Sequence, residues 1–131
     1  MTDFKRPESV LVVIHTPDLQ ILLLERAKHP GYWQSVTGSR EQDESFSATA
    51  CREVAEETGL IVDAVQLRTW PGENIYEIMP EWRHRYAPNV THNREIVFSL
   101  CVPAVCEITL SPIEHRAWRW ACSTARPRVP T

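Results

Sequence analysis

The sequence lacks several features that would assign it to a common class of protein. Its longest apolar run, Val10–Ile14, is far shorter than the roughly 20 residues of a membrane helix. The first residues place no apolar segment behind a basic head, so we expect no signal peptide. The four cysteines form no Cys-x-x-Cys pair, and a chain of 131 residues can bury a core without disulfides. We therefore expect reduced thiols and a cytoplasmic protein.

The chain also lacks the basic character of a typical nucleic-acid-binding domain, because its formal net charge is −3 and its pI is about 5.9. The negative charge is concentrated in residues 38–60, where six acidic and two basic residues give −4. The rest of the chain carries 11 acidic and 12 basic residues and is nearly neutral. We therefore expect neither a nucleic-acid partner nor a membrane partner, and the acidic window is the place to look for function.

The length suits one domain over residues 1–131, with residues 123–131 as a frayed, proline-rich tail. Apolar runs at Ser9–Thr16 and Gln20–Glu25 predict a hairpin, since Pro17 and Asp18 between them favour a turn. Residues 45–58 predict the one clear helix, with Ser45 as its N-cap and Gly59 just after its end. Shorter strands are expected at Trp33–Thr37, Leu60–Leu67, Glu73–Ile78, Glu95–Val102, Glu107–Leu110 and His115–Ala121, with a loop at Pro80–Thr91. This order predicts one mixed α/β (α+β) domain.

The predicted helix carries a cluster of carboxylates. At about 100° per residue, Glu53, Glu56 and Glu57 fall on one side, with Arg52 beside them and an apolar arc around Val54 opposite. Carboxylates this close repel one another, and a hard divalent cation such as Mg²⁺ or Mn²⁺ would reverse that repulsion. The alternative is an ordinary acidic face turned toward solvent.

Nine residues in this window follow a fixed spacing, Gly38-x5-Glu44-x7-Arg52-Glu53-Val54-x-Glu56-Glu57-x-Gly59-Leu60. Average residue usage gives a chance match on the order of one in ten million for a chain of this length. The spacing is that of the Nudix box, and the sequence resembles the Nudix hydrolases, which cleave a nucleoside diphosphate linked to another group. The resemblance implies an α/β/α sandwich with a mixed sheet, and a pyrophosphohydrolase that requires Mg²⁺ or Mn²⁺.

The resemblance also assigns roles to residues of the acidic window. It implies that divalent metal is held by Glu53, Glu56, Glu57 and Glu114. Glu56 and Glu114 are rival candidates for the general base, and Arg52 would orient a carboxylate. Gly38 lets the chain pass tightly before the helix, Glu44 supports the geometry of loop and helix, and Gly59 ends the helix.

Segments outside the box resemble a bacterial branch of the family that converts dihydroneopterin triphosphate to the monophosphate and pyrophosphate in folate biosynthesis. These segments are Lys5–Pro7, Trp33–Ser39, Arg83–Pro88 with Val90, Thr91 and Asn93, and Glu114–His115 before Trp118-x-Trp120. Members of this branch continue into a further C-terminal helix. Residues 122–131 show no helical pattern, so we expect that helix to be missing or altered in this chain.

Basic residues outside the window are the candidates for binding substrate. Lys5, Arg26 and Thr37 match positions that contact substrate in that branch. Arg83, Arg85 and Tyr86 form a basic, aromatic segment that would bind phosphate, because arginine pairs with phosphate oxygens through two hydrogen bonds. A solvated terminus and an ordinary basic loop are the alternatives. His29 and His115 are not expected to be ligands, since an oxygen-rich site does not need them.

Two other functions remain open at this point. A nucleoside triphosphate pyrophosphatase would use the same box with a different base-binding site, and a non-catalytic Nudix module would bind a small-molecule ligand without turnover. The filled glutamate set favours catalysis, because a binding module has no need for repelling carboxylates. The oligomeric state is not indicated by the sequence.

Overall fold

The computed structural model describes residues 4–122, and the strand at its centre is β1 (Glu8–His15). Strand β7 (His92–Cys101) runs parallel to β1 along its whole length. The other edge of β1 is shared by two antiparallel neighbours. β4 (Val36–Ser39) pairs with residues 9–12 of β1, whereas β2 (Gln20–Arg26) joins it at the hairpin end, where His15 faces Ile21. The predicted hairpin is therefore confirmed.

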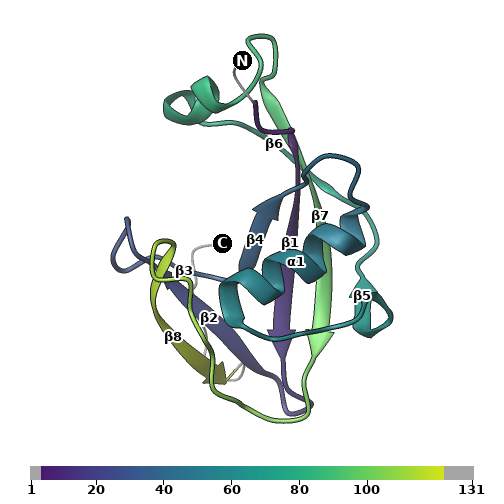
Figure 1. Ribbon diagram of the computed structural model, residues 1–131, viewed down its shortest axis with the longest axis vertical. Coiled ribbons are helices and arrows are strands. Elements are labelled where there is room, and N and C mark those ends of the chain that lie inside the picture. Colours follow the sequence, from purple (N-terminus) through teal and green to yellow (C-terminus); the bar gives the residue numbers. More distant parts are fainter. Residues whose placement is uncertain (1–3, 123–131) are drawn as a thin grey trace.

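The sharing of one edge of β1 makes the sheet diverge into two parts (Figure 1). β2 pairs with β3 (Trp33–Gln34) and β8 (His115–Cys122) in one part. β7 pairs with β5 (Leu67–Thr69) and β6 (Asn74–Glu77) in the other part. The prediction of a single strand over Trp33–Thr37 is wrong, because the chain changes partner at Ser35 and passes from β2 to β1.

Helix α1 (Phe46–Thr58) lies across one face of the sheet (Figure 1). Its predicted ends are confirmed. The Ser45 side chain accepts a hydrogen bond from the Ala48 N–H at 3.0 Å, which satisfies one of the free N–H groups of the first turn. Gly59 adopts the left-handed conformation at φ 77°, and its N–H donates to the Ala55 carbonyl at 3.0 Å.

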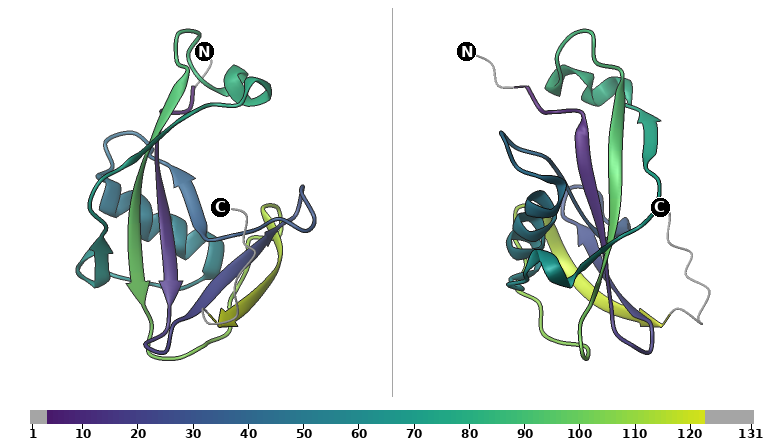
Figure 2. Two further views of the ribbon diagram at one scale, coloured as in Figure 1. Left: turned by 180° about the vertical axis from the view of Figure 1, so that it is seen from behind. Right: turned by 90° about the vertical axis from the view of Figure 1, so that its right-hand side faces the viewer.

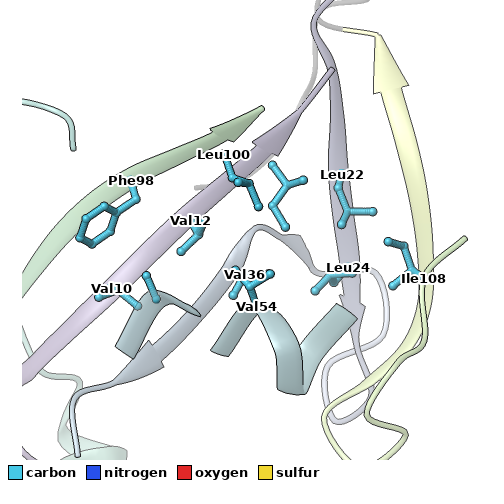
Figure 3. Close-up of a cluster of buried hydrophobic side chains, with 11 residues drawn as sticks. Val10, Val12, Leu22, Leu24, Val36, Val54, Phe98, Leu100 and Ile108 are labelled. Atoms are coloured by element: carbon cyan, nitrogen blue, oxygen red, sulfur yellow. The ribbon is translucent and has the colours of Figure 1, made fainter. Parts of the chain in front are cut away.

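The core lies between α1 and the sheet (Figure 3). Val54 of the helix packs toward Val36, and residues of β1, β2 and β7 fill the remainder of the layer. The predicted opposition of apolar and acidic faces is wrong for Glu53 and Glu57, which are buried like Val54. Glu53 and Glu57 are buried because their side of α1 lies along β4. Glu56 is the only one of the three carboxylates that is exposed.

Two further strand predictions are wrong. In residues 60–67 the chain forms a 3-10 helix, η1 (Ala64–Gln66), because Asp63 and Gln66 cap its first turn reciprocally. Residues 107–110 are not a strand either. This segment runs past the end of α1, where the Thr109 N–H donates to the Thr58 carbonyl and Ile108 enters the core.

The remaining elements differ from prediction mainly in their ends. β6 is shorter than Glu73–Ile78, β7 begins three residues before Glu95, and the Pro80–Thr91 loop contains a 3-10 helix, η2 (Pro80–Arg85). Strand β8 is confirmed, and Trp118 and Trp120 pack on the core. Among residues 4–122, no helix has the length and apolar character that a membrane span needs. The predicted frayed tail and the expected loss or alteration of the C-terminal helix concern residues 123–131, which lie outside the described residues.

Candidate functional site

The two buried carboxylates of α1 lie against strand β4. Glu53 is 8% exposed and Glu57 is 1% exposed. Gly38 leaves the space that Glu53 occupies, since a Cβ at this position would lie 2.0 Å from the Glu53 carboxyl carbon. The backbone of the next residue back, Thr37, hydrogen-bonds to Glu57. One short strand therefore positions both acidic side chains.

The Glu53–Glu57 pair is electrostatically unfavourable when nothing is bound. Desolvation, a hydrogen bond with Glu53 and the charges of Glu53 and Glu114 raise the pKa of Glu57 to about 10. Burial also raises the pKa of Glu53, although Glu57 and Arg52 oppose that shift. Glu57 Oε1 is buried and has no hydrogen-bond partner among the described residues. The pair therefore requires protons or a cation to compensate its charge.

Strand β8 brings a third carboxylate to this pair. Opposite the step from Glu25 to Arg26 in β2, β8 contains one extra residue, so Arg26 pairs with His115 and not with Arg116. Such a bulge redirects the side chains beside it. As a result, ligand atoms of Glu57, Glu114 and His115 all lie within 4.8 Å of one another.

His115 lies beside the carboxylates, a position that the sequence analysis did not predict. It is buried, with Nε2 3.9 Å from Glu57 Oε1 and 3.2 Å from Gln34 Nε2. Burial and the charge of Arg26 lower its pKa, which favours the neutral imidazole. Its position next to Glu114 in the chain was the one available signal. The expectation that His115 is not a ligand stays a prediction.

Arg52 connects the loop before α1 to the carboxylates. Its guanidinium donates to both oxygens of Glu44, at 2.7 and 3.0 Å, and to the Ser39 carbonyl at 2.9 Å. It also donates to Glu53 at 3.0 Å. Hydrogen bonds from Arg52 lower the pKa of Glu44 to about 2, the largest of several causes. Glu44 and Arg52 therefore form a fixed charged pair that orients Glu53.

Glu56 occupies a different environment from the other carboxylates. Its side chain is 52% exposed and pairs with Arg52 at 3.2 Å on the solvent side of the helix. It is not part of the group formed by Glu57, Glu114 and His115. The two candidates for the general base, Glu56 and Glu114, are both exposed and differ in their neighbours.

Basic and aromatic side chains face the carboxylates from the N-terminal segment and from η2. The Lys5 N–H donates to the Arg85 carbonyl at 2.8 Å, and Lys5 Nζ lies 6.0 Å from the centre of the Tyr86 ring. Burial and Arg85 lower the pKa of Lys5, while Glu53 and Glu114 act in the opposite direction. Lys5 is therefore close to both the acidic group and the basic segment.

Three other predicted substrate residues have different surroundings from Lys5. The Arg26 guanidinium lies 5.9 Å from the centre of the Trp82 ring, a contact that the sequence did not suggest, and also interacts with Lys5. Arg83 pairs with Glu77 at 3.4 Å, so the structure does not bring it to the carboxylates. Thr37 donates its hydroxyl to the Val10 carbonyl, while its backbone serves Glu57.

The donor set fits a hard divalent cation. Glu53, Glu57 and Glu114 offer carboxylate oxygens, which Mg²⁺ and Mn²⁺ prefer, and Glu57 Oε1 lacks any other partner among the described residues. His115 is the one nitrogen donor beside them. The arrangement can bind a cation between a carboxylate group and a row of basic side chains, which suits a phosphorylated ligand.

Comparisons with known proteins agree with this geometry. The profile of the NUDIX domain matches residues 5–125. Dihydroneopterin triphosphate diphosphatase of Escherichia coli is 43% identical over 120 residues, covering 89% of this chain and 79% of that protein. The protein of the same name from Haemophilus influenzae is 44% identical over 127 residues, covering 92% and 77%. The solved structure of the E. coli dihydroneopterin triphosphate pyrophosphohydrolase superposes with a TM-score of 0.81 at 42% identity, over 93% of this chain and 84% of that chain. The chain therefore belongs to the Nudix family, and it has the mixed sheet and helix of that fold.

Proposed function

We propose that this protein is a divalent-metal-dependent pyrophosphohydrolase that converts dihydroneopterin triphosphate to dihydroneopterin monophosphate and pyrophosphate in folate biosynthesis. The observation that carries the proposal is the pair of buried carboxylates, Glu53 and Glu57, with the exposed Glu114 beside Glu57 and with Lys5 near Glu53 and Glu114. Relatives at 43% and 44% identity, which carry the name of this activity, support the choice of substrate.

Mg²⁺ is the proposed metal, with Mn²⁺ as a substitute. Glu53 and Glu57 would hold it, and Glu114 would either complete the metal site or act as the general base. When bound, the metal would neutralise pyrophosphate oxygens and lower the pKa of the water that attacks phosphorus. The unpartnered Glu57 Oε1 and the raised pKa of that carboxyl support this assignment, because both are relieved by a cation.

The basic residues would bind the triphosphate. Lys5 lies near Glu53 and Glu114, and Arg26 and Arg85 lie near Lys5, so these cations can offset phosphate charge beside the acidic group. Tyr86 contacts Lys5 and extends the row toward β6. Arg52 acts on the other side, where its bonds to Glu44 and Glu53 keep the carboxylate in one orientation.

Glu114 is the better-supported candidate for the general base. Both carboxylates are exposed, but Glu114 lies beside Glu57 and His115, whereas Glu56 is engaged by Arg52. A base must come within hydrogen-bond reach of the water from which it takes a proton, directly or through one further water. The position of Glu114 beside Glu57 supports this role, because a water at the proposed metal site would lie near it, whereas Glu56 is bound by Arg52.

The first test is release of pyrophosphate from a panel containing dihydroneopterin triphosphate and the common (d)NTPs, with Mg²⁺. Glu57→Gln should lower kcat by roughly 100-fold or more, because it removes one ligand charge while keeping the shape of the side chain. Glu107→Gln, the same change at an exposed position, should keep the wild-type rate. Near wild-type turnover in Glu57→Gln would contradict the metal assignment.

The same panel tests the alternatives. A clear preference for a nucleotide would replace the pterin substrate with a nucleoside triphosphate. Binding without pyrophosphate release, measured by calorimetry with and without Mg²⁺, would indicate a non-catalytic module. Hydrolysis in ¹⁸O-water identifies the attacked phosphorus, since the label enters either the monophosphate or the pyrophosphate.

A further inference from the structure

The strand registers place a second group of polar side chains on the face of the sheet opposite α1, because Ser9 alternates with the core residue Val10. The left view of Figure 2 shows these strands in front of the helix. Ser9 of β1, Asn93 of β7 and Tyr76 of β6 come from three successive strands. Asn93 Nδ2 donates to Ser9 Oγ at 2.8 Å and to the Tyr76 hydroxyl at 3.0 Å. Asn93 is 2% exposed and Tyr76 is 46% exposed, so the group is buried but reaches solvent at Tyr76.

The strand registers give the position of this group relative to Thr37, the residue of β4 whose backbone bonds Glu57. Leu11 faces Thr37 across β1 and β4, and Ser9 and Leu11 share a face because alternate residues of a strand point the same way. Thr37, whose backbone bonds Glu57, and Asn93 therefore lie on the same face, separated by β1. Thr37 is level with Val97 of β7, four residues past Asn93, so two strand spacings of about 4.8 Å and about 3.3 Å per residue along the strand give a separation on the order of 16 Å. This is comparable with the length of an extended triphosphate ester.

Lys5 and Tyr86 connect the polar group to the proposed metal ligands. Tyr86 is close enough to Tyr76 to affect its pKa, and the Tyr86 ring is also the contact of Lys5. Lys5 in turn lies near Glu53 and Glu114. A triphosphate bound along Lys5 would thus have its distal group at the proposed metal ligands and its organic group at Tyr76 and Asn93.

The polar group offers hydrogen-bond acceptors that no described residue fully uses. Asn93 Oδ1 is buried without a hydrogen-bond partner among residues 4–122, which is unfavourable for a protein amide. Glu95 is the register partner of Ser9 and lies on the same face two residues after Asn93. Within the described part of the chain its carboxylate accepts one hydrogen bond, from Asn74 Nδ2 at 3.2 Å. A carboxylate can accept several further hydrogen bonds.

We propose that Asn93 and Glu95 bind the N–H edge of the substrate's ring and select for it, an inference that rests on the proposed pterin substrate. The 2-amino-4-oxopyrimidine part of a pterin presents an amino group and a ring N–H side by side, which a carboxylate can accept together. Guanine has the same edge, whereas adenine does not. Ser9 and Tyr76 hold the Asn93 amide so that Oδ1 remains available to the ring.

Direct binding of the ring tests this site without catalysis. Neopterin, which has the ring but no phosphate, is titrated against the metal-free protein and followed by its fluorescence. Glu95→Gln replaces one acceptor oxygen by a donor with little change in shape, so the Kd should rise at least about tenfold. Glu107→Gln is the matched control and should keep the wild-type Kd. Equal Kd values for wild type and Glu95→Gln would overturn the proposal.

A kinetic comparison separates this inference from the proposed function. The ratio of kcat/KM for dihydroneopterin triphosphate to that for dATP should fall at least about tenfold in Glu95→Gln, mainly through KM, and the dGTP to dATP ratio should fall with it. If wild type prefers dihydroneopterin triphosphate and Glu95→Gln keeps the full preference, the ring site is wrong and the function stands. If wild type does not prefer the pterin, the proposed function itself fails.

Discussion

Gly38 shows how one residue of the site is required by its neighbour. Its backbone does not adopt a positive φ, unlike Gly31, Gly59 and Gly72. Its missing side chain matters because the Glu53 carboxylate occupies that space. Glu53 in turn is held by Arg52, which Glu44 fixes through two hydrogen bonds. The position of a proposed metal ligand thus depends on a glycine and on a charged pair, neither of which would touch the metal.

Gly38→Ala should therefore weaken the binding of Mg²⁺ more than it weakens the fold. The added Cβ would lie 2.0 Å from the Glu53 carboxyl carbon, so the carboxylate must leave its position, which a flexible side chain can do at modest cost in stability. The Mg²⁺ concentration that gives half-maximal activity should rise roughly tenfold or more. The measurement is a Mg²⁺ titration of pyrophosphate release, together with thermal unfolding of both proteins. A half-maximal concentration within twofold of wild type would contradict the role given to Gly38.

At the scale of elements, the parts that depend on local sequence were predictable. The ends of α1 follow from Ser45 and Gly59, whose preferences act within one turn of the helix. The change of partner at Ser35 was not predictable, because it depends on β1 giving one edge to two strands. The 107–110 segment has strand-like residues but bonds to the end of α1 instead. Tertiary contacts override local preference in both cases.

The candidate site also has features that the sequence predicts and features that it does not. The box spacing predicts that Glu53 and Glu57 act together, and both lie in the site. Their burial was not predictable, because the helical period alone places them opposite Val54 and only packing on β4 turns them inward. His115 and Trp82 were missed for a related reason. The bulge in β8 and the position of η2 over Arg26 are properties of the assembled sheet.

The β8 bulge supports the site through an ion pair with β2. Arg116 is the extra residue of the bulge, and its guanidinium binds both oxygens of Glu25 at 3.0 and 3.1 Å. Glu25 is buried and also accepts the Gly31 N–H at 2.8 Å. Arg116→Ala should therefore lower kcat/KM roughly tenfold, because Glu114 and His115 precede the bulge directly. Arg68→Ala, at an exposed arginine of β5, is the control for charge and should stay near wild type. Equal kinetics in the two variants would show that the bulge does not depend on this pair.

At the scale of the whole molecule, acidic and basic residues that are far apart in the sequence are brought together by the fold. The acidic residues come from α1 and the start of β8, while the basic ones come from residues 5–26 and from η2. The sheet brings these segments to one place because β1 and β7 run parallel, which carries Lys5 and η2 to the same end. Folding of the metal-free protein therefore gathers carboxylates before any cation is present, and its stability should reflect that.

The metal-free protein should lose stability as pH rises, and Mg²⁺ should remove much of the loss. The pKa of Glu57 is about 10 in the folded protein and 4.5 in the reference state, so the folded state binds this proton more tightly. The stability that the proton contributes is complete below pH 4.5 and is lost as pH rises through the folded value. Mg²⁺ binds the deprotonated form, so its stabilising effect should be larger at about pH 8 than at about pH 5. Thermal unfolding at both pH values, with Mg²⁺ or with a chelator, measures this directly. Glu57→Gln should flatten the pH dependence of the metal-free protein, while Glu107→Gln should keep it. An equal Mg²⁺ effect at the two pH values would show that the cation does not compete with the Glu57 proton.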